Sequence, residues 1–223
     1  MSAQASQSHI DDETCYCSDA ENAHAEPEGS KSNAQATASE IENIGTAQEM
    51  FFYRRDIRNR GIYAADDKSS KQIYFVDIPY SPWGTSFTIR RDDQHGDIVA
   101  TVRRVGPGHP FDILFTGQNQ FQYLNDDGKM VFKYGCVVSR THKFTYRNRK
   151  LAWKRGLNVH RLRDLDTDEV IAEFDVTFFS TDKDGKLIIG GEYARDPLWV
   201  DVIVTTAMTY QRRARELRNR ETF

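Results

Sequence analysis

The segment that decides the fold reads DPLWVDVIVTTAMTYQRRAR, from Asp196 to Arg215. Aspartate can cap the free N–H groups of a helix, and proline fits the first helical position, where its missing N–H costs nothing. Nearly every residue from Leu198 to Tyr210 is apolar or threonine, and a helix that is apolar on all faces has to be buried on all sides. The run is shorter than the roughly 20 apolar residues that span a bilayer. We therefore expect a helix over 197–213 that passes through the middle of a domain, with no transmembrane segment.

One acidic residue interrupts this apolar run. Asp201 lies about one turn into the predicted helix, where the helix dipole favours a negative charge. Once enclosed, its carboxylate needs a hydrogen-bond donor, because an unpaired buried charge is costly. We expect Thr205 or an arginine of the surrounding wall to supply that donor.

The chain before the helix consists of short apolar-alternating runs separated by turn residues, a pattern typical of an all-β domain. Turn chemistry marks the breaks, as at His95-Gly96, Asp166-Thr167-Asp168 and Asp182-Lys183-Asp184-Gly185. About a dozen strands predict a sandwich or a barrel, and a closed antiparallel barrel around the helix would bury the helix and remove the sheet edges together. The expected strands are 73–78, 86–91, 97–105, 111–116, 121–124, 130–134, 136–139, 143–147, 150–154, 157–162, 169–179 and 186–190.

The amino-terminal part of the chain differs in composition from the rest. Residues 1–48 contain nine acidic residues and one basic residue, Lys31, so they carry −8, and the net charge of −3 leaves +5 for residues 49–223. With few large apolar residues, 1–48 are expected to be a disordered acidic tail, either a solvated spacer or a screen for a basic patch. We expect a linker or short helix over 49–71, the barrel with its helix over 72–215, and a basic tail over 216–223.

Six short motifs follow one another along the chain: Trp153-Lys154, Leu162-Arg163-Asp164, Val170-Ile171-Ala172, the run from Gly185 to Ile189, Val200–Thr206 and Arg212-Arg213. Their order resembles the tubby C-terminal fold, which is shared with LURP-one-related proteins and phospholipid scramblases. It is most similar to the fungal tubby-like proteins of unknown function, over about residues 72–215. The resemblance implies a closed antiparallel barrel around a central helix, and it includes members that bind phosphoinositides or are proposed to scramble lipids.

A basic segment is the main candidate for function. Residues 128–163 contain eleven lysines and arginines, two histidines and no acidic residue. Strand alternation places Phe144, Tyr146, Leu151 and Trp153 on the inner face and the neighbouring cations on the outer face. A row of cations on a rigid sheet suits phosphates, as on an anionic membrane or a phosphorylated ligand. The predicted anionic-ligand site is Arg140, Lys143, Arg147, Arg149, Lys150 and Lys154.

The same segment has simpler interpretations. Glu173 and Asp175 can supply cross-strand partners, which would make the basic segment an ordinary solvated face. Aromatic residues among cations are also found in base-stacking platforms, but Phe144, Tyr146 and Trp153 cannot stack on bases if they lie in the core. The sequence contains no RNA-recognition, zinc-finger or helix-turn-helix signature, so nucleic-acid binding is disfavoured.

The sequence contains no fingerprint of catalysis or of a cofactor. The loop from Asp182 has Leu187 and Tyr193 where a calcium loop needs glycine and glutamate, and the spacing of Cys15 and Cys17 does not fit a zinc site. No paired catalytic carboxylates, triad or phosphate loop are found. We therefore expect a protein that is not an enzyme and that uses no cofactor and no metal.

Three functions follow as hypotheses. The first is a non-enzymatic tubby-like domain that binds an anionic phospholipid, a phosphoinositide or another phosphorylated ligand. The second is a protein-interaction scaffold with no lipid ligand, and the third is scramblase-like lipid translocation, which an enclosed helix disfavours. The lack of a signal-peptide core predicts an intracellular, cytoplasmic location, with peripheral attachment to a membrane under the first hypothesis.

Overall fold

The computed structural model describes residues 47–221 apart from 57, 80–85, 105–108, 117–128, 135–140, 157–158 and 178–179. Within these residues twelve strands form one closed barrel, and each strand pairs antiparallel with its neighbours in the chain. Pairing of β1 with β12 closes the barrel. The strands are β1 Gln48–Arg54, β2 Arg60–Tyr63, β3 Gln72–Asp77, β4 Phe87–Arg91, β5 Ile98–Arg103, β6 Phe111–Phe115, β7 Lys129–Tyr134, β8 His142–Tyr146, β9 Arg149–Arg155, β10 Val159–Asp164, β11 Val170–Val176 and β12 Lys183–Ile189.

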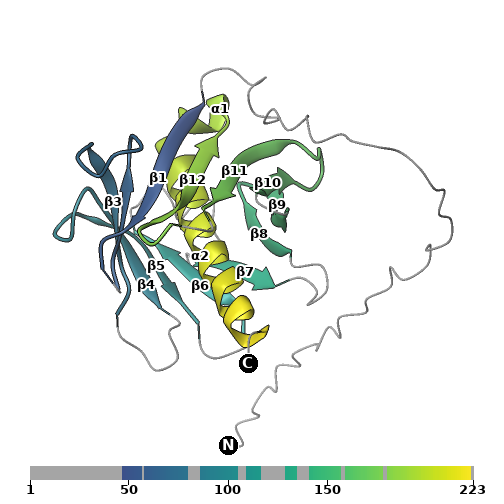
Figure 1. Cartoon of the computed structure of the whole chain (residues 1–223). Coiled ribbons are helices and arrows are strands. Elements are labelled where there is room, and N and C mark those ends of the chain that lie inside the picture. The colour runs from purple at the N-terminus through teal and green to yellow at the C-terminus, as the bar shows by residue number, and fades with distance from the viewer. Residues whose placement is uncertain are drawn as a thin grey trace, which may run out of the picture. The chain divides into compact units, whose positions relative to one another are not determined.

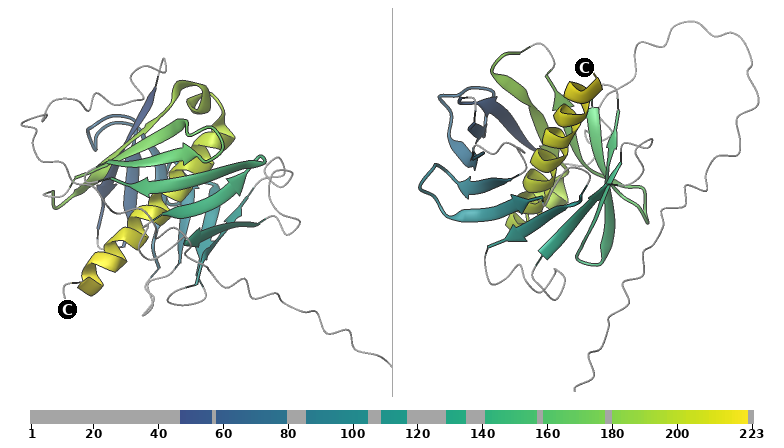
Figure 2. Two further views of the ribbon diagram at one scale, coloured as in Figure 1. Left: turned by 90° about the vertical axis from the view of Figure 1, so that its right-hand side faces the viewer. Right: turned by 90° about the horizontal axis from the view of Figure 1, so that it is seen from below.

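Two helices follow the strands, the short α1 (Gly191–Ala194) and the long α2 (Pro197–Glu221). Figures 1 and 2 show α2 passing through the ring of strands. Every residue from Trp199 to Gln211 is buried, so all faces of this part of the helix are covered. The prediction of a closed β-barrel around a hydrophobic helix is therefore confirmed.

The start of α2 also follows the prediction. Oδ1 of Asp196 accepts a hydrogen bond from the backbone N–H of Leu198 at 2.9 Å, as an N-cap does. The guanidinium of Arg147 contacts the same carboxylate, which ties the β8–β9 turn to the helix entrance. The predicted end was wrong, because α2 continues to Glu221 instead of ending at 213, so residues 216–221 of the expected basic tail belong to the helix.

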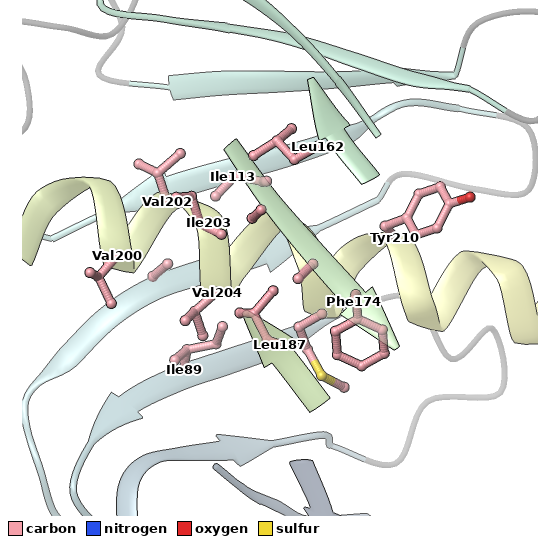
Figure 3. Close-up of a cluster of buried hydrophobic side chains, with 14 of the residues drawn as sticks. Ile89, Ile113, Leu162, Phe174, Leu187, Val200, Val202, Ile203, Val204 and Tyr210 are labelled. Carbon is pink, nitrogen blue, oxygen red and sulfur yellow. The ribbon is translucent and has the colours of Figure 1, made fainter. Parts of the chain in front are cut away.

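Alternating side chains fill the space between the strands and α2. In β6, for example, Phe111, Ile113 and Phe115 are buried, whereas the residues between them are partly exposed. Figure 3 shows strand residues such as Ile89 and Leu187 lying against Val204 of the helix. Burial of each such side chain contributes about 1.5–3 kcal/mol, so the core depends on the presence of α2.

The expected linker or short helix over 49–71 is corrected by the structure. This segment contains most of β1 and all of β2, which belong to the barrel. Met50, Phe52 and Ile62 are buried in the main core, which explains why these strands form. The expected acidic tail over 1–48 lies almost wholly outside the described residues, as do the expected strands 121–124 and 136–139.

The predicted turn over Asp182–Gly185 is also wrong in part, because β12 already begins at Lys183. The pairing shifts at this point: Phe52 lies opposite Gly185, and Tyr53 lies opposite Lys183. Asp184 is therefore the extra residue of a β-bulge, which can redirect a side chain. A Cβ atom at Gly185 would lie 2.3 Å from the carbonyl oxygen of Asp175, so only glycine allows β11 and β12 to approach this closely.

Candidate anionic-ligand site

The β8–β9 hairpin positions the predicted basic residues. Its two-residue turn, Arg147-Asn148, has positive φ at both positions, 49° and 61°, as in the tight hairpin turns that match strand twist. Phe144, Tyr146, Leu151 and Trp153 are buried, as alternation predicts. This placement excludes the three aromatic residues as a base-stacking surface.

The strands β7–β10 are neighbours in the barrel (Figure 1), and the cations that alternate away from the core form one basic surface on them. We call this surface the basic face. Lys143 lies directly opposite Lys133 on β7, and Lys154 lies opposite Arg161 on β10. Opposite residues in an antiparallel pair have Cβ atoms about 4.5–5.5 Å apart, so like charges are adjacent. The basic face consists of Lys133, Lys143, Lys150, Lys154, Arg161 and Arg163.

Two carboxylates neutralise part of this face. Glu173 accepts a hydrogen bond from Nε of Arg161 at 2.7 Å, as the cross-strand interpretation expected for Glu173. Asp168 lies 3.3 Å from Arg163 and 3.7 Å from Lys154. Counted over the described residues, six cations and two carboxylates leave an excess of four positive charges. Within the described part of the chain, Lys133, Lys143 and Lys150 have no ion pair.

Two predicted site residues are engaged within the protein instead. Arg147 does not continue the outer row of β8, because it lies in the turn and pairs with Asp196. Arg149 donates from Nη1 to the hydroxyl of Tyr193 at 2.7 Å and from Nη2 to Glu169 at 3.0 Å. Its Nε donates to Asp164. Arg140 lies outside the described residues.

Arg149 and its partners form a fixed network near α1. Burial alone would lower the pKa of Arg149, but its bonds to Asp164 and Tyr193 hold that pKa above the usual range. Burial and the hydrogen bond to Glu169 raise the pKa of Tyr193. Each of the three guanidinium nitrogens of Arg149 thus donates to a partner within the protein, which makes Arg149 part of the scaffold that supports the basic face.

The two histidines of the basic segment lie inside the barrel. His142 stacks on Phe132 with ring centroids 5.2 Å apart and meets the edge of Tyr210 at 5.0 Å. His160 packs against the same tyrosine at 5.1 Å. Burial, and to a smaller extent the nearby positive charge of Arg213, lowers the pKa of His142 to about 3. His142 is therefore neutral at pH 7 and adds no charge to the surface.

Tyr74 and Arg91 both donate hydrogen bonds to Asp201. The hydroxyl of Tyr74 donates to Oδ1 at 2.8 Å, and Nη2 of Arg91 donates to Oδ2 at 2.6 Å. The expected arginine of the wall is confirmed, whereas Thr205 makes no described hydrogen bond to Asp201. Burial raises the pKa of Asp201 even though Arg91 lowers it, so its ionised form is held at a net cost.

A second group of cations was not predicted from the sequence. Arg54, Arg60 and Arg215 converge on the fully buried carboxylate of Asp184. They come from β1, the start of β2 and α2, which are far apart in the chain. The only signal in the sequence was the arginine-rich stretch from Arg54 to Arg60, which gave no indication of the residue it would meet.

Among the described residues, no group of three or more His, Cys, Asp and Glu side chains could hold a metal ion. The described part of the chain also contains no helix whose length and apolar character would let it cross a membrane.

Comparisons with known proteins leave the chain without a family assignment. No family model matches it, and no curated protein matches its sequence. Among solved structures it is similar to the X-ray structure of an Arabidopsis thaliana protein, at 12% sequence identity and a TM-score of 0.44. That match covers 72% of this chain and 91% of the other.

Proposed function

We propose that this chain is a non-enzymatic, tubby-like domain that binds anionic phospholipid surfaces through the basic face. The pairing of Lys133 with Lys143 is the observation that carries the proposal. Like charges directly opposite each other destabilise a sheet, and neither lysine has a described ion pair that would offset this repulsion. A negatively charged surface would remove the repulsion.

The size of the effect follows from the excess charge. Attraction to an anionic membrane surface is about 1 kcal/mol per basic residue, so an excess of four charges contributes roughly 4 kcal/mol. That corresponds to an increase in binding of about a thousandfold. The enclosure of α2 supports binding at a surface over translocation of lipid, because its apolar side chains are already packed in the core.

Vesicle flotation tests the proposal. The chain is mixed with vesicles of phosphatidylcholine alone or of phosphatidylcholine with phosphatidylserine, at low and at physiological salt. We expect binding only when phosphatidylserine is present, and weaker binding at the higher salt because the Debye length shortens. The triple variant Lys143→Glu, Lys150→Glu, Lys154→Glu should lose this binding.

A matched control separates the basic face from overall charge. The triple variant Lys71→Glu, Arg103→Glu, Arg195→Glu changes net charge equally at exposed positions outside the basic face, and it should still float with the vesicles. Equal loss of binding in both triple variants would refute a local site. Absence of binding by the unmodified chain would refute the lipid proposal and favour the protein-interaction scaffold.

A further inference from the structure

A pocket of ≈ 670 Å³ lies where α2 passes the ends of β1, β2 and β12. It is separate from the basic face, whose residues belong to β7–β10. Five of its eight lining residues are cationic. We call it the basic pocket, and its lining residues are Arg54, Arg55, Asp56, Arg60, Lys68, Thr181, Asp182 and Arg215.

Asp184 organises the arginines of this pocket. Its Oδ1 accepts hydrogen bonds from Nε of Arg54 and Nη2 of Arg215, both at 2.6 Å, and its Oδ2 accepts from Nε of Arg60 at 2.9 Å. Three guanidinium groups therefore share one carboxylate. These four side chains together carry a net charge of +2.

The other acids of the pocket are already engaged. The carboxylate of Asp56 accepts hydrogen bonds from the backbone N–H groups of Arg58 and Asn59 at 2.7 and 2.8 Å. Asp182 pairs with Lys68 at 2.8 Å. Counting Asp184, five cations face three carboxylates, so the pocket carries a net charge of +2.

We propose that the basic pocket binds a dianionic phosphate group, from a soluble phosphate ester or from the phosphomonoester headgroup of a lipid. A phosphate monoester carries about −1.5 to −2 charges at pH 7, which matches the excess in the pocket. Guanidinium groups are the donors best suited to phosphate because their planar fork can bind two oxygens at once.

The arginines also retain donors for such a ligand. The described hydrogen bonds use Nε and Nη1 of Arg54 and of Arg60, and only Nη2 of Arg215. Among the described residues, no acceptor is hydrogen-bonded to Nη2 of Arg54, to Nη2 of Arg60 or to Nη1 of Arg215. Thr181 also lines the pocket, and a threonine hydroxyl is a neutral donor.

The electrostatics of Arg60 agree with this excess of charge. Burial and the positive charges of Arg215 and Arg54 lower its pKa, although Asp184 opposes the shift. The side chain of Arg60 is only 11% exposed, so water does little to screen the neighbouring arginines. An anion in the pocket would relieve their repulsion.

Isothermal titration calorimetry with glycerol 3-phosphate tests the soluble form of the ligand. Flotation with vesicles of phosphatidylcholine and phosphatidic acid tests the lipid form, because phosphatidic acid has a phosphomonoester headgroup. Vesicles with phosphatidylglycerol, whose phosphate is a singly charged diester, are the control. Binding of glycerol 3-phosphate, or binding of phosphatidic acid in preference to phosphatidylglycerol, supports the site.

The variant Arg55→Gln, Lys68→Gln removes two cations of the pocket but leaves the three arginines on Asp184 in place. We expect it to fold and to bind the phosphate probe about tenfold or more weakly. The variant Lys143→Gln, Lys150→Gln on the basic face removes the same charge and should bind the probe as the unmodified chain does. Loss in the first variant alone supports the pocket even if the basic face binds no membrane.

Two results would overturn the inference. One is that neither glycerol 3-phosphate nor vesicles with phosphatidic acid bind to the chain. The other is equal weakening by the pocket variant and by the basic-face variant, because a general effect of charge would explain it. A circular dichroism melt of each variant shows whether it is folded. The variant Thr181→Val changes the pocket without changing its charge, and we expect it to weaken binding of the phosphate probe about threefold.

Discussion

Replacing Asp184 by asparagine removes the one carboxylate that holds three arginines. Asparagine has nearly the same shape, but its NH₂ group would face guanidinium donors, so one arginine loses its acceptor and all three repel one another. Breaking a buried ion pair costs about 3–5 kcal/mol. Because Arg54 and Arg215 are 37% and 27% exposed, water screens part of this cost, and we expect about 3 kcal/mol.

Urea unfolding followed by tryptophan fluorescence measures this cost, since Trp153 and Trp199 lie in the core. For a domain of this size, about 3 kcal/mol corresponds to a fall in Tm of roughly 6–12 °C. The slope of the unfolding free energy against urea concentration should be the same as in the unmodified chain. An unchanged slope shows that the substitution alters stability and leaves the compactness of the denatured state as it was.

The same substitution at Asp201 is the matched control. Burial raises the pKa of Asp201, whereas the arginines outweigh burial and lower the pKa of Asp184. Asparagine at 201 keeps an acceptor for Tyr74, and the side chain of Arg91 is 37% exposed, so we expect a loss below about 1 kcal/mol.

The pH dependence gives a second check on Asp184. The pKa of Asp184 is lower in the folded protein than its unfolded value of 3.8. The contribution of its carboxylate to stability is therefore fully present above pH 3.8 and is lost as the pH falls through the folded pKa. The difference between the unmodified chain and Asp184→Asn should therefore shrink below about pH 3.8. Equal losses from the two asparagine variants, or a loss below about 1 kcal/mol at Asp184, would refute this account of the cluster.

Three further predictions concern the core and the helix entrance. Stability should fall as the pH drops from 6.5 toward 3, by at most about 1.4 kcal/mol per pH unit, because the unfolded chain binds a proton that buried His142 rejects; His142→Phe should flatten this slope in urea titrations. Thr206→Val leaves the indole N–H of Trp153 without its 3.1 Å acceptor and should cost about 1–3 kcal/mol, seen as a lower urea midpoint than for Thr209→Val. Asp196→Ala removes the cap on Leu198 and the ion pair with Arg147. The cap contributes about 0.5–2 kcal/mol to the unfolding free energy, and Asp196→Ser should recover that part of the loss.

The barrel and its helix could be predicted because both depend on local patterns. In a water-soluble domain, a helix without a polar face has to be buried on all sides. Alternation of apolar and polar residues between turn residues identifies the strands. Ten of the twelve strands overlap expected ones; the other two, β1 and β2, were missed. In β1, Met50, Phe51, Phe52 and Tyr53 form a continuous run of buried residues, and this hides the alternation that identifies a strand.

The basic pocket could not be predicted because its parts meet only through closure of the barrel. Asp184 resembles a turn residue within Asp182–Gly185, and a bulge cannot be recognised from one strand alone. Its partners Arg54 and Arg215 lie 130 and 31 positions away in the chain. The basic face, in contrast, comes from consecutive hairpins, so its lysines could be grouped from the sequence, although the turn position of Arg147 could not.

The joining of β1 to β12 has a consequence for how the protein is made. The ribosome delivers the two strands of this seam more than a hundred residues apart, and α2 emerges only after both. The inward side chains of the strands pack against α2, so they cannot be fully buried until α2 has been synthesised. The nascent chain therefore exposes apolar strand residues until then. Such long-range pairing slows folding and favours aggregation, and we expect this protein to depend on chaperones during its production.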